Sequence, residues 1–484
     1  MNNSIKENIN LLKQTFSESA DLTVREMELN SKSKTSCAVV TIDGLSDKNE
    51  ITLSVTNPLL SYNFRNSEPS KIFDEVITNV LFSCDNIEFN SFSEIIQYIT
   101  KGFAVLLIDG CERFIAIGTQ GYSYRSISEP DSEVVQRGSR EGFTEPLRVN
   151  MSLIRRRIKS PDLVFETLTV GETSQTELML CYLQDSVDYN MLEEVRSRLQ
   201  ACKIDTVLAA GYLSEYLEDE NSGLLFSGVG ISERPDTVCG KLTEGRIAVI
   251  VDGTPAVLIV PHLFVEEFQG IDDYSNRVYY ASFIRILKYL SFFISVCLPG
   301  LYTALAQFHP EYFPTWILIQ TSESLAKTPL PVTIEVLFIT FVYEIMKEAG
   351  LRIPKSLGHA VSIVGALVIG DSAVNAGIIS ASTLMVVATA AICSYVISSL
   401  YPPITMLRFA YIIVGGTLGL WGIVLLTAVI IINVCSKTSL GVPYMSSISP
   451  FSLKRMRDVF IRASWKKLDD YTIRVDKFRE TEDL

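Results

Sequence analysis

The stretch FAYIIVGGTLGLWGIVLLTAVIIINV, residues 409–434, contains no charged side chain. A second uncharged stretch covers residues 289–308. A helix needs about 20 apolar residues to cross roughly 30 Å of hydrocarbon, and both stretches reach that length. The sequence therefore predicts membrane-spanning helices in the C-terminal part of the chain.

Charge is distributed unevenly along the 484 residues. Charged residues, 20% of the total, recur from the start to about residue 280, whereas long stretches between residues 286 and 433 contain almost none. This contrast predicts a soluble part followed by a membrane part. The first fifteen residues lack the apolar core of a signal peptide, so we expect the soluble part in the cytosol. The net charge of −13 disfavours nucleic-acid binding.

The usual sequence signatures of catalysis and metal binding do not occur in this chain. It has three histidines, and its nine cysteines include no C-x-x-C pair, which disfavours a zinc site or a disulfide framework. Glycine-rich phosphate loops and nucleophile elbows are also absent from the sequence. We therefore expect a protein that is not an enzyme and that carries no cofactor and no metal.

The soluble part repeats a short pattern of strand and turn residues. The three phrases are CAVVTIDG (37–44), FAVLLIDGCERFIAIG (103–118) and IAVIVDGTPAVLIVP (247–261). The last two each predict a hairpin with an Asp-Gly turn. Asp43 precedes Asp185 by 142 positions, and Asp109 precedes Asp252 by 143. A strand–helix unit followed by a hairpin is therefore predicted to occur twice; the alternative is two unrelated hairpins.

The predicted fold class is an α/β cytosolic region of two similar subdomains, followed by an α-helical polytopic membrane domain. The expected boundaries are an N-terminal segment (1–30), a first α/β subdomain (31–135), a linker (136–164), a second α/β subdomain (165–270), a transmembrane domain (271–435) and a basic cytosolic tail (436–484).

The candidate membrane spans are residues 286–306, 331–347, 357–378, 379–400 and 408–433. Basic residues flank the first span and follow the last, so the positive-inside rule places both ends in the cytosol. The number of crossings must then be even, and we expect one of the five candidates to be re-entrant or interfacial. Residues 309–331 contain four prolines and a tryptophan, which predicts an interfacial loop.

Two glutamates interrupt the apolar segment 331–347. Acidic residues within a membrane segment normally face protein or water, so Glu335 and Glu344 are candidates for a cation route. The alternative is an interfacial helix with both carboxylates in the headgroup layer.

The stretch VSIVGALVIGDSAVNAGIIS, residues 361–380, combines apolar residues with two polar ones. On a helix, one face carries Val361, Val364, Val368, Asp371 and Asn375. In a ring of subunits, a valine stripe forms an apolar constriction and an acidic ring favours cations, so these five are candidate pore-lining residues. The alternatives are valines that only fill a bundle and an aspartate that caps a helix.

Charged residues in the soluble part indicate contacts between domains or subunits. The candidates are Glu233, Arg234 and Asp236 of the phrase SERPD, together with Arg137; a solvated ion pair before a proline turn is the alternative. The three arginines at 155–157 favour a solvated helix face with some salt bridges over a surface that binds acidic partners or headgroups. The basic tail fits attachment to an anionic leaflet or simple marking of topology.

Four longer phrases resemble the A subunits of GerA-type spore germinant receptors. They are RSISEPDSEVVQRGSREGFTEPLRVNMSLIRRRIKSPDL (125–163), SERPDTVCGKLTEGRIAVIVDGTPAVLIVP (232–261), DDYSNRVYYASFIRILKYL (272–290) and EAGLRIPKSLGHAVSIVGALVIGDSAVNAGIIS (348–380). The resemblance implies a polytopic protein of the inner membrane of a spore that works with a transporter-like B subunit and a lipoprotein C subunit. It also implies an A subunit that oligomerises into the ion-conducting part of a nutrient sensor.

Two positions depart from the family pattern. Relatives have R-G-P where this chain has Arg137, Gly138 and Ser139, so the rigidity of a proline is missing. Relatives have a glutamine where this chain has Asp371, which argues against a mechanism that requires an ionised group there.

Two functions are predicted as alternatives. The first is a subunit of a nutrient-gated ion channel, built as a ring in contact with membrane lipid, that triggers spore germination. The second is a non-conducting scaffold that positions a nutrient-binding, transporter-like partner. A secondary transporter is disfavoured because the sequence shows no inverted repeat of broken helices.

Overall fold

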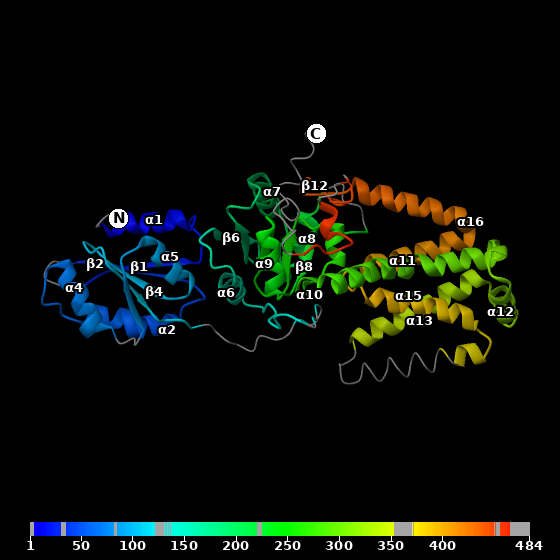
Figure 1. Ribbon diagram of the computed structural model, residues 1–484, viewed down its shortest axis with the longest axis horizontal. Coiled ribbons are helices and arrows are strands. Elements are labelled where there is room, and N and C mark those ends of the chain that lie inside the picture. The colour runs from blue at the N-terminus through cyan, green and yellow to red at the C-terminus, as the bar shows by residue number, and fades with distance from the viewer. Residues whose placement is uncertain are drawn as a thin grey trace.

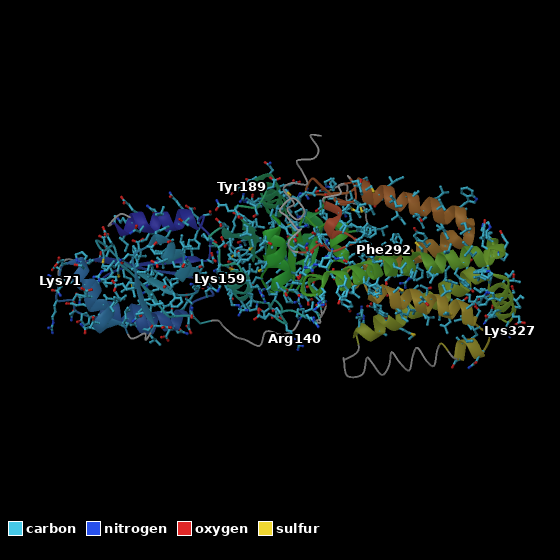
Figure 2. The ribbon with its side chains drawn as sticks, viewed as in Figure 1. Lys71, Arg140, Lys159, Tyr189, Phe292 and Lys327 are labelled. Atoms are coloured by element: carbon cyan, nitrogen blue, oxygen red, sulfur yellow. The ribbon has the colours of Figure 1, made fainter. Side chains whose placement is uncertain are left out.

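The computed structural model describes residues 4–30, 35–81, 85–121, 130, 133, 135, 137–219, 225–352, 370, 372–449, 451 and 455–464. Two α/β units and a helical bundle follow one another along the long axis of the molecule (Figure 1). Lys71 of the first unit and Lys327 of the bundle lie at opposite ends (Figure 2).

The first unit is an antiparallel sheet covered by helices on both faces. Its strands are β1 (Leu22–Glu28), β2 (Ser36–Ile42), β3 (Asn86–Phe89), β4 (Ala104–Ile108) and β5 (Phe114–Ile117), in the order β1-β2-β4-β5-β3. Its helices are α1 (Ile5–Thr15), α2 (Lys48–Glu50), η1 (Ile51–Thr56), α3 (Asn57–Ser61), α4 (Pro69–Glu75), η2 (Val76–Val80) and α5 (Phe92–Thr100). Successive strand residues point to opposite faces, so Ala38 packs with α1 and α5 whereas Val39 packs with α3 and α4.

The second unit has the same architecture. Its strands are β6 (Leu163–Val170), β7 (Thr176–Leu183), β8 (Gly230–Ser232), β9 (Ile247–Val251) and β10 (Val257–Val260), in the equivalent order β6-β7-β9-β10-β8. Its helices are α6 (Leu147–Arg157), α7 (Tyr189–Gln200), α8 (Gly211–Leu217) and α9 (Pro235–Thr243). The predicted fold class, two similar α/β subdomains followed by an apolar helical region, is confirmed.

In each unit the Asp-Gly turn of the hairpin caps the first helix. The backbone N–H of Ile5 donates to Asp109 Oδ1 at 2.9 Å, and that of Leu147 donates to Asp252 Oδ1 at 3.0 Å. A carboxylate is favourable there because the first N–H groups of a helix have no partner within the helix. The units therefore begin at α1 and α6, earlier than the predicted starts at residues 31 and 165.

The arginines at 155–157 form the salt bridges expected of this face, but Arg155 is buried and not solvated. Arg155 is 1% exposed, and its Nε donates to Asp21 Oδ2 at 2.7 Å. Because Asp21 directly precedes β1, this ion pair joins the first unit to α6 of the second. Arg156 and Arg157 both pair with Glu141 at 2.6 Å.

The bundle begins after a short connection at the end of the second unit. Its elements are η3 (Phe264–Phe268), α10 (Ile271–Ser275), α11 (Val278–Phe308), η4 (Pro310–Tyr312), α12 (Thr315–Leu325), α13 (Val332–Arg352), α15 (Ala381–Tyr395) and α16 (Tyr401–Ser436), followed by β11 (Thr438–Ser439), β12 (Val442–Pro443) and η5 (Arg455–Asp458). Among the described residues, the helical segments 278–308 and 398–436 are long and apolar enough to cross a membrane. The predicted interfacial loop contains α12, at the end of the bundle farthest from the α/β units (Figure 1).

Helix α16 folds back on itself at Gly419. This glycine has a φ of +64°, which residues with a side chain rarely adopt. The Tyr411 hydroxyl lies 2.8 Å from Thr427 Oγ1, although 16 residues of straight helix span about 24 Å. The predicted single span 408–433 is therefore two antiparallel arms, 401–418 and 420–436.

Two glycines allow α11 and α16 to approach closely. A Cβ on Gly300 would lie 2.5 Å from the Tyr411 carbonyl oxygen. A Cβ on Gly415 would lie 2.4 Å from the Gly300 carbonyl oxygen. Small residues at a helix contact permit this spacing.

We expect Gly300→Ala to lower the unfolding temperature of the full-length protein, because an added methyl group in a close-packed contact costs about 1–3 kcal/mol. The control is Gly240→Ala in α9, where an added Cβ meets no atom within 4 Å. That change should raise stability by up to about 1 kcal/mol, since alanine favours helix over glycine. A Gly300→Ala protein as stable as the wild type would contradict the close packing.

Candidate functional site

One buried arginine of α16 contacts three other helices of the bundle. Arg408, in α16, has no exposed surface. Its Nε donates to the Ser295 carbonyl of α11 at 3.0 Å, and a terminal nitrogen donates to the Ala390 carbonyl of α15 at 3.4 Å. Its other terminal nitrogen lies 3.4 Å from the Glu344 carboxylate of α13. A single guanidinium thus joins α11, α13, α15 and α16.

Pro299 explains why the Ser295 carbonyl is available to Arg408. A proline has no N–H, so within a helix it leaves the carbonyl four residues earlier without its usual donor. Pro299 lies inside α11, and the carbonyl concerned is that of Ser295. In the apolar interior an unsatisfied carbonyl is costly, and Arg408 supplies the missing donor.

Glu344, a predicted member of a cation route, lies in a network with positive charge. Its carboxylate accepts a hydrogen bond from the Tyr401 hydroxyl at 2.6 Å and one from Thr405 Oγ1 at 3.5 Å, besides its contact with Arg408. The Lys347 ammonium lies over the ring of Tyr401. This carboxylate therefore has a cationic partner within the bundle.

Glu335, the second predicted member, is fully buried and caps α15. Its Oε1 accepts a hydrogen bond from the backbone N–H of Ser380, the N-cap residue of that helix, at 2.6 Å. Its Oε2 has no hydrogen-bond partner among the described residues. The two glutamates of α13 therefore differ: one is neutralised by an arginine, and the other has no basic partner in the described part of the chain.

Of the predicted pore-lining residues, the structure describes one. Val361, Val364, Val368 and Asp371 lie outside the described residues. Asn375 lies in a short helical segment before α15, and its side chain is exposed.

The predicted contact residues around SERPD hold the connection between the two α/β units. Arg234 is buried and pairs with Asp236 at 2.6 Å, and it donates to the backbone carbonyl of Ser139 at 2.7 Å. The Glu233 carbonyl accepts from the N–H of Phe143 at 2.8 Å. These contacts fix the segment that precedes α6.

Arg137 lies on the same connection, close to the start of the bundle. Its backbone N–H donates to Asp272 Oδ1 of α10 at 3.1 Å. The connecting segment thus contacts both the second α/β unit and the first helix of the bundle.

A cluster of charges around His262 joins the second α/β unit to the bundle. His262 Nδ1 lies 3.0 Å from Glu266, and its Nε2 lies 2.9 Å from Glu267. Glu266 also pairs with Lys241 at 2.9 Å and with Arg246. Burial alone would lower the pKa of His262, but the two carboxylates raise it to about 9. Burial alone would raise the pKa of Glu267, but His262 and, to a smaller extent, the side chain of Ser399 just before α16 lower it.

The segment after α16 returns to the α/β end of the bundle and packs there. Ser439 Oγ donates to the Gly228 carbonyl of the second unit at 2.7 Å. Further on, Asp458 pairs with the buried Arg285 of α11 at 2.7 Å, and Arg285 also pairs with Asp273 of α10. Part of the predicted basic tail is therefore packed against the protein.

Arg408, Pro299 and His262 are not among the predicted site residues. An isolated arginine beside an apolar run and a proline within another are visible in the sequence, and both signals point to polar contacts inside a bundle. His262 gives no such signal, because its carboxylate partners are common surface residues. Among the described residues, no group of three or more histidines, cysteines and acidic residues is placed to hold a metal ion.

Comparison with known proteins places these features in a family context. The model of the Bacillus/Clostridium GerA spore germination protein family matches residues 10–472. Spore germination protein KA of Bacillus subtilis (strain 168) is 38% identical over 485 residues, covering 99% of this chain and 89% of that protein. Spore germination protein GerLA of Bacillus cereus is 33% identical over 452 residues, covering 93% and 91%.

A solved structure is also similar to this chain. It is the crystal structure of the N-terminal domain of the A subunit of the Bacillus megaterium spore germinant receptor GerK3. The match is 27% identical, has a TM-score of 0.42, and covers 55% of this chain and 97% of that one.

Arg408→Met should destabilise the protein by about 3–5 kcal/mol, since it leaves Glu344 without its cationic partner in the bundle. Adding Glu344→Gln should recover part of this loss by removing the unpaired charge. Adding Pro299→Ala should recover more, because alanine supplies the N–H that the Ser295 carbonyl lacks. Thermal unfolding of the detergent-solubilised protein measures each step. The Pro299–Arg408 link is excluded if Pro299→Ala has the same effect with and without Arg408.

His262 should make stability depend on alkaline pH. A histidine whose pKa is raised by folding contributes its full stabilisation below its ordinary value of 6.5 and loses it as the pH rises through about 9. The wild-type unfolding temperature should therefore fall over this window, and His262→Gln should flatten the decline. His309→Gln, at the far end of the bundle, is the control and should leave the decline intact. Parallel curves for His262→Gln and the wild type would refute the assignment.

Proposed function

Because the chain belongs to the Bacillus/Clostridium GerA spore germination protein family, we propose that it forms, as a ring of copies, a nutrient-gated ion channel of a spore germinant receptor. In this proposal a nutrient binds to a transporter-like B subunit, with a lipoprotein C subunit as the third component. Binding shifts the ring of A subunits from closed to open, and the ion flux triggers germination.

The observation that carries this proposal is the set of ionisable groups inside the apolar bundle. Arg408 and Glu335 have no exposed surface, and Glu344 lies beside Arg408. Such groups are costly in a membrane protein and usually mark a functional region. They form a fixed polar framework of α11, α13, α15 and α16. We propose the valine stripe of residues 361–375 as the constriction.

We further propose a multi-pass arrangement in the inner membrane of the spore, with the α/β units in the cytosol. The α/β units and the segment after α16 lie at one end of the bundle, as this topology requires. The second arm of α16 exposes large apolar side chains, among them Trp421, Val424 and Val429, which suits contact with lipid.

The contact residues provide a route by which the cytosolic units can influence the bundle. Arg234 fixes the connecting segment, and Arg137 on that segment meets α10, which leads into α11. The His262 cluster forms a second link through Ser399 at the start of α16. We propose that these links transmit rearrangements between subunits to the bundle.

A non-conducting scaffold is the second candidate. The specific observation in its favour is the pairing of Glu344 with Arg408, because an acid neutralised by a fixed arginine offers less to a passing cation than a free one. In that case the bundle only positions the nutrient-binding partner.

Val368→Ala should increase ion leakage several-fold in the absence of nutrient, because a smaller side chain widens an apolar constriction and makes it easier to wet. Ion flux from vesicles that contain the assembled receptor measures this effect. Val424→Ala, on the exposed arm of α16, is the matched control and should not leak. Unchanged resting permeability in the Val368→Ala receptor would remove this residue as a gate.

Asp371→Asn separates polarity from charge at the same stretch. If the carboxylate forms an ionised ring, the selectivity for cations over anions should fall, since a neutral amide attracts cations less. If the position needs only polarity, as the glutamine of relatives implies, selectivity should stay unchanged while conduction persists. Reversal potentials under a salt gradient distinguish the two results.

A further inference from the structure

Four hydroxyl groups form a closed ring beside the carboxylate of Glu335. Ser380 Oγ lies 2.8 Å from Thr383 Oγ1 and 3.3 Å from Ser382 Oγ. The Tyr302 hydroxyl of α11 lies 3.1 Å from Ser382 Oγ and 3.4 Å from Thr383 Oγ1. The ring therefore combines the start of α15 with one residue of α11, and Glu335 of α13 bonds to the same start through Ser380.

This cluster contains more hydrogen-bond acceptors than donors. Each hydroxyl has one hydrogen and two lone pairs, so a closed ring uses every hydrogen and leaves one lone pair on each oxygen. One of these, on Ser380 Oγ, accepts from the backbone N–H of Thr383 at 3.3 Å. Oε2 of Glu335 has no hydrogen-bond donor among the described residues. A site that combines several hydroxyl oxygens with a carboxylate oxygen suits a hard cation.

The negative charge of the Glu335 carboxylate also requires a positive partner. Glu335 is fully buried, and a buried carboxylate is stable only when it is neutralised. The N-terminus of α15 offers the equivalent of about half a positive charge, which does not complete the balance. Glu344 shows the contrasting solution, since Arg408 provides its counter-charge.

We propose that Glu335 and the hydroxyl ring of Tyr302, Ser380, Ser382 and Thr383 bind a monovalent alkali cation. One positive charge balances one carboxylate, whereas a divalent ion would leave the buried site with excess charge. A bound cation holds α11, α13 and α15 together at the end of the bundle away from Arg408. The inference concerns binding by a single chain and stands whether or not the assembled protein conducts ions.

The test compares thermal unfolding of the purified full-length protein in lithium, sodium, potassium, rubidium and choline chloride at equal ionic strength. We expect at least one alkali cation to raise the unfolding temperature in a saturable way relative to choline, because a ligand that binds only the folded state stabilises it. Binding of radioactive rubidium, displaced by the preferred cation, provides a second measurement that does not depend on unfolding.

Two variants identify the residues responsible. Glu335→Gln keeps the shape of the side chain and removes its charge, so it should abolish the cation dependence and bring the unfolding temperature in choline close to the cation-bound value. Thr383→Val removes one oxygen and should weaken the apparent affinity at least tenfold without abolishing it. Glu344→Gln is the matched control on the same helix and should retain the cation dependence.

Equal unfolding temperatures in choline and in all alkali salts would overturn the proposal and leave a proton as the neutralising ion. A cation dependence that survives unchanged in Glu335→Gln would overturn it as well, by placing the ion elsewhere. If the assembled protein shows no nutrient-gated ion flux but still binds the cation, the channel proposal fails and the cation-site proposal is supported.

Discussion

The guanidinium of Arg408 determines how the helical bundle is organised. It has no exposed surface, so its charge and its hydrogen bonds have to be satisfied within the bundle. Pro299 frees the Ser295 carbonyl for it, Glu344 balances its charge, and Ala390 accepts a further hydrogen bond. Four helices are thereby fixed relative to one another by contacts that tolerate little displacement. Gly300 and Gly415 add a second contact between α11 and α16, two of the helices that Arg408 joins.

The junction between the α/β units and the bundle is built from buried charges in the same way. Arg285 pairs with Asp273 and with Asp458 of the returning C-terminal segment. His262 links the second unit to the start of α16 through Glu267. Breaking a buried ion pair is strongly destabilising, because it leaves an uncompensated buried charge. These buried pairs couple the α/β units to the helices, which is what the proposed transmission of movement between them needs.

Much of the α/β region follows from local sequence rules, and the bundle does so only in part. The Asp-Gly turns and their spacing predict both hairpins and the duplication, because turn chemistry and strand alternation are local. The boundaries failed where α1 and α6 join their sheets through Asp109 and Asp252, which is a tertiary contact. The bend of α16 at Gly419 is not predictable from the sequence, because the whole segment is apolar. A glycine in such a segment occurs both in straight helices and at bends. Glu335 and Glu344 were recognised as unusual, but the arginine that separates their roles lies some 60 positions away in sequence.

The central claim is that copies of this chain assemble into a ring that conducts ions. The most direct measurement is the mass and symmetry of the full-length protein extracted from membranes together with its partner subunits, observed as intact particles. We expect a closed ring of identical copies, with the stretch 361–375 of each chain facing the central axis. A particle with a single copy of this chain, or a heterotrimer without a central axis, would contradict it.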